Sequence, residues 1–291
     1  MLRAPGELLG HDGLVKNAAD VGTFDTDYPA EIAAVLSLMA NNIGRLGGDL
    51  YIWSTYEFRM IEIDDGLAGT SSIMPQKKNP HSLERIRGIA GLAIGWFPAY
   101  QGALRNASSS DLTLAFAGDP LPDIANECIS IIELMQATLE TMTVNTEVMR
   151  ERAGIFWSTT SHLADELVRH ADISFRTAHH VVGRVVRNAI AAGLAPGDVT
   201  SEMVDIAAGE TIGRTLGLDE QIVRDAFSPE GFISSRRTSG SAHPDAVRET
   251  VEDGRTLLSQ HQLWLDQQAS HLEAANRELR SSAQSMIESV S

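Results

Sequence analysis

Apolar side chains recur at intervals of three and four residues along much of the chain. Between residues 31 and 60 this spacing gives one continuous helical stripe, which predicts a helix of about 45 Å at roughly 1.5 Å per residue. The stripe consists of Ile32, Val35, Leu36, Met39, Ile43, Leu46, Leu50 and Trp53. A helix of this length exceeds the average in globular proteins and is typical of a helical bundle.

The same spacing predicts two further long helices. One follows Pro80 and runs from 81 to about 105, with a kink expected at Pro98 because proline lacks an amide hydrogen and clashes with the preceding turn. A polar break at 106–111 separates it from another helix, over about 121–143. The positions of the first helix expected to face the core are Leu83, Ile86, Ile89, Ala90, Ala93, Ile94 and Phe97.

Near residues 144–146 the pattern changes from long helices to short ones. Ser174, Thr200 and Asp219 each stand where the N-cap of a short helix is expected. The short β-branched runs lie inside helical periodicity, so almost no strand is expected and the predicted fold class is all-α. The predicted parts are a long-helix bundle domain over 1–145, a smaller helical domain over 146–250 and a C-terminal helix over 251–291.

The C-terminal helix carries an apolar side chain at every seventh position. The row consists of Val251, Leu258, Leu265, Leu272, Leu279 and Met286. Its companion positions are partly polar, which favours a helix packed along a neighbour over a self-standing coiled coil.

The charge balance narrows the function classes. Thirty-nine acidic and 23 basic residues give a net charge of −16, which argues against nucleic-acid or membrane-surface binding. A small anionic substrate would then need a local positive site. Lys77, Lys78, Arg85 and Arg87 can supply one, although scattered solvated charges fit Arg85 and Arg87 equally well.

Several further features indicate a soluble, cytoplasmic protein. No run approaches the roughly 20 apolar residues of a membrane span, and the first residues lack the apolar core of a signal peptide. The single cysteine, Cys128, lies in an apolar helical stretch and is interpreted as a core residue. His179 and His180 point to different faces of a helix, so both cannot readily bind one ion and no metal site is expected.

The most informative segment is 69–80, which reads Gly-Thr-Ser-Ser-Ile-Met-Pro-Gln-Lys-Lys-Asn-Pro and holds two of the three lysines in the chain. It resembles the signature of the fumarase/aspartase superfamily, and its variable positions are most similar to those of argininosuccinate lyases. The alternative is an ordinary surface loop rich in Gly, Ser and Pro. The matching positions are Ser71, Ser72, Met74, Pro75, Lys77 and Asn79.

The resemblance extends over about residues 5–250. Family members have a substantial portion before the corresponding point, so the chain is expected to lack that portion. The resemblance implies a homotetramer of long-helix bundles that converts an N-substituted aspartate to fumarate and an amine by β-elimination, without metal or cofactor. A non-catalytic structural or truncated member of the same superfamily is the alternative.

The resemblance also implies roles for individual residues. Ser71 corresponds to the catalytic base, and Lys77 and Asn79 to the cation and amide that hold the carboxylate next to the developing carbanion. A serine hydroxyl is too weak an acid to act as a base unless nearby charge and exclusion of water stabilise its alkoxide, which predicts a loop that closes over the substrate. Ser72 and Met74 are expected to contact substrate or loop, and Lys78 to be a solvated charge.

Glu84 corresponds to the carboxylate that pairs with a histidine in this family, and that histidine is expected in the preceding portion. The alternative is a surface glutamate that favours the first turn of its helix through the helix dipole. Without the histidine, we expect the chain alone to release no fumarate.

The substrate itself stays open. Argininosuccinate lyases carry a Tyr-Asn-x-Asp-x-Gln-x-x-Lys stretch after the second long helix, whereas residues 105–113 of this chain contain no Tyr, Gln or Lys. The fumarate-forming residues are therefore present without the arginine-side residues. An N-substituted aspartate other than argininosuccinate, or a related succinate, is compatible with this pattern.

Overall fold

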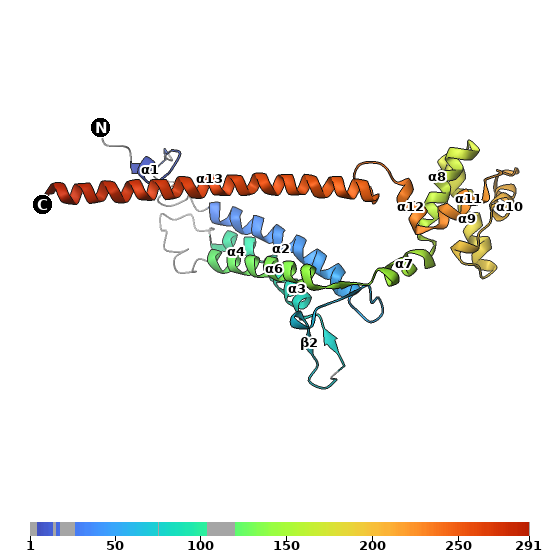
Figure 1. Ribbon diagram of the computed structural model, residues 1–291, viewed down its shortest axis with the longest axis horizontal. Coiled ribbons are helices and arrows are strands. Elements are labelled where there is room, and N and C mark those ends of the chain that lie inside the picture. The colour runs from blue at the N-terminus through green and yellow to red at the C-terminus, as the bar shows by residue number, and fades with distance from the viewer. Residues whose placement is uncertain (1–4, 14–15, 18–26, 75, 104–119, 291) are drawn as a thin grey trace. The chain divides into compact units, whose positions relative to one another are not determined.

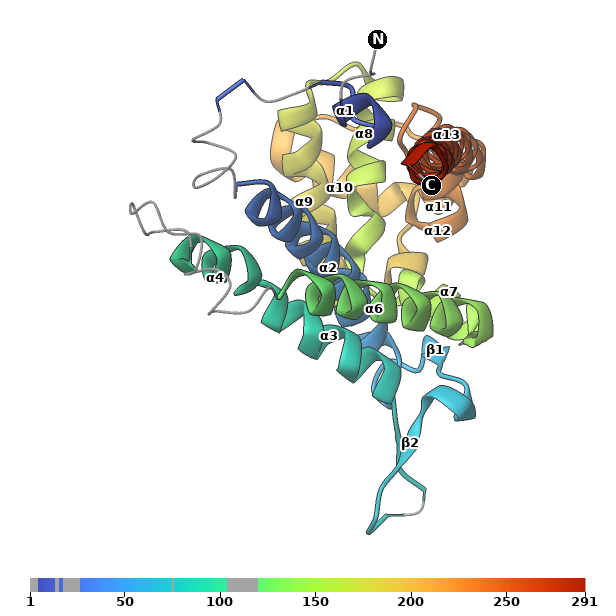
Figure 2. The ribbon, with the colours of Figure 1, turned by 90° about the vertical axis from the view of Figure 1, so that its left-hand side faces the viewer.

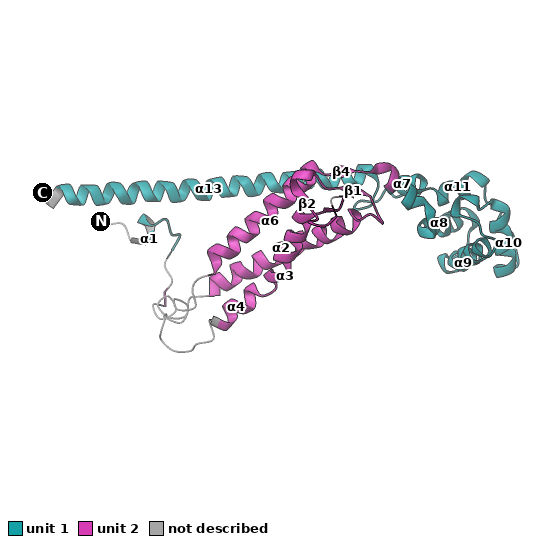
Figure 3. Ribbon diagram, turned by 90° about the horizontal axis from the view of Figure 1, so that it is seen from below, with its two compact units in different colours: residues 1–13, 149–291 teal, residues 14–148 magenta. Residues whose placement is uncertain are grey.

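The computed structural model describes residues 5–13, 16–17, 27–74, 76–103 and 120–290. Most of these residues are helical, as expected for an all-α protein, and the strands that the structure describes there are two residues long (Figure 1). The chain divides into two compact units: unit 1 contains 1–13 and 149–291, and unit 2 contains 14–148 (Figure 3).

Unit 2 is built from long helices that lie side by side (Figure 2). They are α2 (Asp27–Trp53), α3 (His81–Ala93), α4 (Trp96–Ala103) and α6 (Leu121–Thr141). Strand β1 (Ile61–Glu62) pairs antiparallel with β4 (Thr143–Val144), and β2 (Gly69–Thr70) pairs antiparallel with β3 (Lys78–Asn79). A short 3-10 helix, η2 (Asp65–Leu67), precedes β2.

Helix α2 packs through small residues rather than through the predicted apolar stripe. Gly44 faces Ala90 of α3 so closely that a Cβ on the glycine would lie 2.3 Å from the Ala90 Cβ, and Gly47 faces Ile86. Leu50 of the predicted apolar stripe is buried. Four other residues of the stripe are exposed: Ile32, Val35, Leu46 and Trp53. Close approach of the helix backbones moves the contact line onto glycine and alanine.

The second predicted helix is interrupted one turn before Pro98. Helix α3 ends at Ala93 and α4 begins at Trp96, where Pro98 occupies the first turn. Proline cannot donate to the carbonyl four residues earlier, that of Ile94, which explains the position of the break. Leu83, Ile86, Ile89, Ala90 and Ala93 are buried as predicted, whereas Ile94 and Phe97 are exposed. The predicted break at 106–111 lies outside the described residues.

Unit 1 consists of short helices followed by one long helix. They are α1 (Pro5–Leu8), α7 (Thr146–Ile155), η3 (Trp157–Thr159), α8 (Thr160–Ala171), α9 (Phe175–Ala191), η4 (Pro196–Asp198), α10 (Ser201–Ile212), α11 (Glu220–Phe227), α12 (Pro229–Ser235) and α13 (Pro244–Val290). Helix α7 begins in unit 2 and continues into unit 1. The predicted N-caps are confirmed: the side chains of Ser174, Thr200 and Asp219 accept backbone N–H bonds from their helices.

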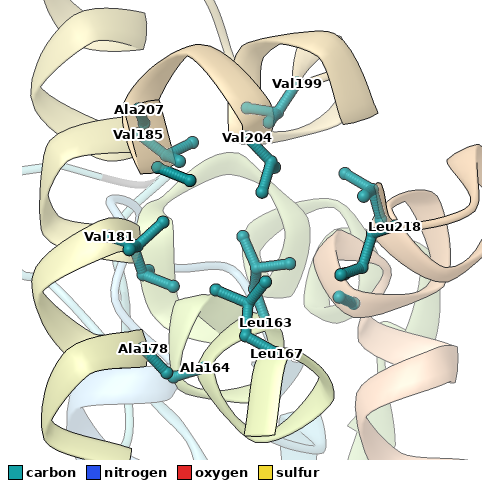
Figure 4. Packing of buried hydrophobic residues seen from close by; sticks show 14 of the residues in the cluster. Leu163, Ala164, Leu167, Ala178, Val181, Val185, Val199, Val204, Ala207 and Leu218 are labelled. Carbon is teal, nitrogen blue, oxygen red and sulfur yellow. The ribbon is translucent and has the colours of Figure 1, made fainter. Parts of the chain in front are cut away.

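One apolar core unites α8 to α11. Leu163 and Leu167 of α8 point toward Val181 and Val185 of α9, and Val204 of α10 closes the cluster (Figure 4). These five side chains are buried. The two valines confirm that the β-branched runs of this region belong to a helix.

Helix α13 is one continuous helix of 47 residues, and its heptad row is largely exposed. A contact that partly covers it comes from the segment after α1. Gly10 lies against Ala275 and Leu272, and the Nε2 of His271 is 3.1 Å from the Gly10 carbonyl oxygen. Packing of the whole row along a neighbour stays a prediction.

Cys128 is buried in α6, as predicted, and its Sγ lies 3.6 Å from the Leu36 carbonyl oxygen. Burial raises the pKa of its thiol.

Within the described ranges, no helix combines the length and apolar character needed to cross a membrane.

His162 is expected to make unit 1 less stable in mild acid. Its side chain is 4% exposed, and its Nδ1 lies 3.6 Å from Glu166 Oε1 and 3.5 Å from Ser235 Oγ. Burial lowers its pKa from the ordinary value of 6.5; Glu166 and Asp165 oppose this shift, while Arg236 and Arg169 add to it.

The folded state therefore binds fewer protons at His162 than the unfolded state does. The free energy of unfolding should fall as the pH drops below about 6.5, toward the lower folded-state pKa. Thermal unfolding followed between pH 7.5 and about 5.5 should show a smaller pH dependence in His162→Gln than in the wild type. The exposed His179→Gln is the matched control, and an unchanged slope in His162→Gln would contradict the assignment.

Candidate active site

The segment that carries the predicted catalytic residues is a β-hairpin between α2 and α3. Gly69 pairs with Asn79 and Thr70 with Lys78, and the ladder continues where the Ser71 N–H donates to the Lys77 carbonyl oxygen at 3.3 Å. The Lys77 N–H donates to the Met74 carbonyl oxygen at 3.0 Å and closes the turn. The hairpin extends away from the helices of unit 2 (Figures 1 and 2). Ser71 and Lys77 are therefore cross-strand neighbours.

The hydroxyl of Ser71 accepts two backbone hydrogen bonds. The N–H groups of Ile73 and Met74 donate to its Oγ at 3.2 and 3.1 Å. Donors directed at an oxygen favour its anionic form. Ser71 itself is half-buried, while Ser72, Ile73 and Met74 are exposed at the hairpin tip.

A cleft of about 740 Å³ lies at the base of the hairpin. It is lined by Lys77 and Asn79, together with Gln76, Lys78 and Pro80. Ser71, Ser72, Met74 and Glu84 do not line it. The structure thus brings the predicted cation and the predicted amide to one cleft and leaves the predicted base on the same hairpin, toward its tip.

Lys78 is an exposed charge, as the sequence indicated, and it also forms ion pairs. Its Nζ lies 2.6 Å from Asp65 Oδ1 and 3.0 Å from Glu62 Oε1. The hydrogen bond to Asp65 raises the pKa of Lys78, and the same bond lowers the pKa of Asp65. The pair ties the hairpin base to η2 and β1, and it neutralises Lys78 as a potential substrate cation.

Glu84 stands in the first turn of α3, and His81 Nε2 lies 3.9 Å from its Oε2. The imidazole of His81 also covers Gly69: a Cβ on this glycine would lie 1.7 Å from His81 Cε1. The glycine at position 69 thus has a local steric reason.

The two arginines left open by the sequence have separate partners. Arg85 Nη2 lies 2.8 Å from Glu127 Oε2, so this charge joins α3 to α6. Arg87 stacks over the ring of Tyr51 at 4.4 Å, and Tyr51 lines the cleft.

Sequence reasoning missed most of the cleft wall. Tyr51, Tyr56 and Arg59 come from the end of α2 and the turn after it, and Asn145 comes from the segment after β4. The Asn145 N–H donates to the Met60 carbonyl oxygen at 2.9 Å, which joins these distant segments. The short β1–β4 pair has no periodic pattern, so no sequence signal could have predicted this contact.

Comparison with known proteins agrees with this arrangement. Residues 9–95 match a protein family described as "Lyase", and residues 157–234 match one described as "Argininosuccinate lyase C-terminal". The chain is an argininosuccinate lyase-like member of this lyase superfamily. Two curated relatives are argininosuccinate lyase 1 of Shouchella clausii strain KSM-K16 and the argininosuccinate lyase of Methanosphaera stadtmanae.

The first relative is 36% identical over 259 residues, which cover 88% of this lyase-like chain and 52% of the relative. The second is 32% identical over 255 residues, which cover 87% of the chain and 55% of the relative. The chain therefore spans about half the length of the curated relatives it matches.

A solved structure, that of an EDDS lyase variant with bound fumarate, superposes with a TM-score of 0.87 at 33% identity. The match covers 97% of this chain and 56% of the other. Because only 3% of this chain lies outside the match, the aligned part must include most of the 47 residues of α13. Helix α13 therefore has a counterpart in this EDDS lyase. The bundle fold of the superfamily is thereby confirmed.

Proposed function

We propose that this lyase-like chain takes part in β-elimination of an N-substituted aspartate. A base removes a proton from the carbon next to one carboxylate, the bond between the adjacent carbon and nitrogen breaks, and fumarate and an amine form. One proton leaves the carbon and one proton is taken up by the departing amine, so the protons balance. Support comes from the membership in a family of lyases and from fumarate bound to a structurally similar EDDS lyase variant.

The observation that carries the proposal is the hydrogen bonding of Ser71. Its Oγ receives the N–H groups of Ile73 and Met74, and both donors would stabilise an alkoxide. Lys77, its cross-strand neighbour, is the cation assigned to balance negative charge that develops on the substrate. The half-buried hydroxyl is still in contact with water, so the proposed mechanism requires substrate to exclude water from it.

Lys77 and Asn79 are proposed to hold the carboxylate next to the carbanion. This carboxylate becomes doubly negative as the carbanion forms, so a cation and an amide donor stabilise the transition state more than the ground state. Both residues line the cleft at the base of the hairpin. Ser72 and Met74 are proposed as further contacts of the loop with substrate.

Glu84 is proposed to orient an imidazole that protonates the departing amine. His81, the histidine within 3.9 Å, lies on the same helix turn, and a histidine from another copy or segment is the alternative partner. Association is supported by large apolar side chains of α2 that remain exposed, including Val35 and Leu38. We propose a homotetramer, by resemblance to the family.

The proposed substrate is an N-substituted aspartate other than argininosuccinate. Residues 105–113 lack the arginine-side residues of argininosuccinate lyases, and they lie outside the described residues.

Fumarate titration tests the binding half of this proposal. Calorimetric titration of the chain with fumarate should give an affinity that falls about 10-fold or more in Lys77→Ala and in Asn79→Ala, because each removes a charged or dipolar contact. Lys16→Ala is the matched control, since Lys16 is the one lysine outside the signature. Equal affinities in all three variants would contradict the assigned roles.

A further inference from the structure

The cleft carries more positive charge than the fumarate-forming part of a substrate uses. Of its basic residues, Lys78 is neutralised by Glu62 and Asp65. Among the described residues, no carboxylate lies within ion-pairing distance of Lys77 or Arg59. A chain with a net charge of −16 thus keeps two uncompensated cations at one cleft, an arrangement suited to an anion with several carboxylates.

Arg59 is held in an unusual backbone conformation. Its φ is +48°, in the left-handed region that residues other than Gly, Asn and Asp rarely adopt. The backbone around it is well anchored: its N–H donates to the Thr55 carbonyl oxygen at 2.8 Å, and the Met60 N–H donates to the Trp53 carbonyl oxygen at 3.0 Å. A glycine would fit this turn with less strain, so an arginine here favours a functional explanation.

The Arg59 side chain is oriented by an aromatic ring. Its guanidinium carbon lies 5.1 Å from the centre of the Tyr56 ring. Stacking of this kind uses the face of the guanidinium and leaves the N–H groups on its edge available to a ligand. A carboxylate with two oxygens matches such an edge in a bidentate manner.

We propose that Arg59 binds a carboxylate on the amine part of the substrate. The inference rests on the proposed function, since Lys77 and Asn79 would hold the part that becomes fumarate. The substrate class is then an N-substituted aspartate whose leaving amine carries an acidic group. A cleft of about 740 Å³ lies within the range of roughly 300–1,000 Å³ for sites that enclose ligands of drug size, which leaves room for this additional group.

Paired titrations test the assignment. Aspartate and N-(carboxymethyl)aspartate are titrated into the wild-type chain, Arg59→Gln and the exposed control Arg45→Gln. The wild type and the control should bind N-(carboxymethyl)aspartate more tightly than aspartate. Arg59→Gln should lose about 10-fold or more of its affinity for the N-substituted ligand and keep its affinity for aspartate. A wild type without preference, or equal losses for both ligands, would overturn the proposal.

Two further variants distinguish ligand binding by Arg59 from a role in folding alone. Lys77→Ala should weaken the binding of both ligands. If it weakens the binding of neither while Arg59→Gln behaves as expected, the proposed function fails and the arginine site remains. Arg59→Gly should raise the thermal unfolding temperature, because glycine tolerates positive φ, while it loses the preference for the N-substituted ligand. A lower unfolding temperature together with an unchanged preference would assign Arg59 a purely structural role.

Discussion

Alanine at position 71 is expected to lower fumarate formation by about 100-fold or more, with the fold retained. The substitution removes the oxygen that accepts the N–H groups of Ile73 and Met74 and, with it, the proposed base. Lys77→Ala should cause a loss of similar size, because the doubly negative intermediate then lacks its cation. Rates are measured from the ultraviolet absorbance of fumarate, in a preparation of the chain that catalyses fumarate release.

Lys78→Ala provides the matched comparison within the same loop. Lys78 pairs with Glu62 and Asp65, so its removal should loosen the base of the hairpin and reduce turnover much less. Circular dichroism of each variant checks that the helices persist. Small effects of equal size at Ser71 and Lys78 would show that the role assignment is wrong.

Gly44→Ala is expected to destabilise unit 2 by about 1–3 kcal/mol. The new methyl group would lie 2.3 Å from the Ala90 Cβ, and neither group can rotate away, so α2 and α3 must separate. The gain in helix propensity from glycine to alanine, about 0.5–1 kcal/mol, is too small to offset the loss of packing along the helix pair.

Gly48→Ala is the matched control on the same helix. Apart from its chain neighbours and the backbone of its own helix, no atom of the described residues lies within 4 Å of a Cβ at this position. The substitution should therefore leave stability unchanged or raise it by about 0.5–1 kcal/mol. Denaturant unfolding followed by circular dichroism measures both variants, and equal stabilities would mean that the close approach of α2 and α3 does not stabilise the unit.

The helices and their caps could be predicted from the sequence because they depend on local patterns. Ser174 and Thr200 begin their helices as expected, and the signature loop was identified by its fixed spacing. The face that α2 buries could not be predicted from its apolar stripe. Gly44 and Gly47 contribute almost no hydrophobic signal, yet they decide how closely α3 approaches.

The cleft could be predicted only in part. Lys77 and Asn79 belong to the recognised signature, whereas Arg59 and Asn145 reach the cleft through a two-residue strand pair between segments about 80 residues apart in sequence. Pairs this short have no periodicity. The ion pair of Lys78 with Glu62 joins residues 16 positions apart outside any helix, so the sequence did not indicate this partner.

The sharpest test of the proposed elimination is fumarate release from a panel of N-substituted aspartates. The chain is assayed alone and together with a segment that corresponds to the remaining half of its curated relatives, and each assay is repeated with Ser71→Ala. We predict Ser71-dependent release of fumarate once the segment is supplied. Absence of release from every substrate in both assays, or release that persists unchanged in Ser71→Ala, would contradict the proposed elimination.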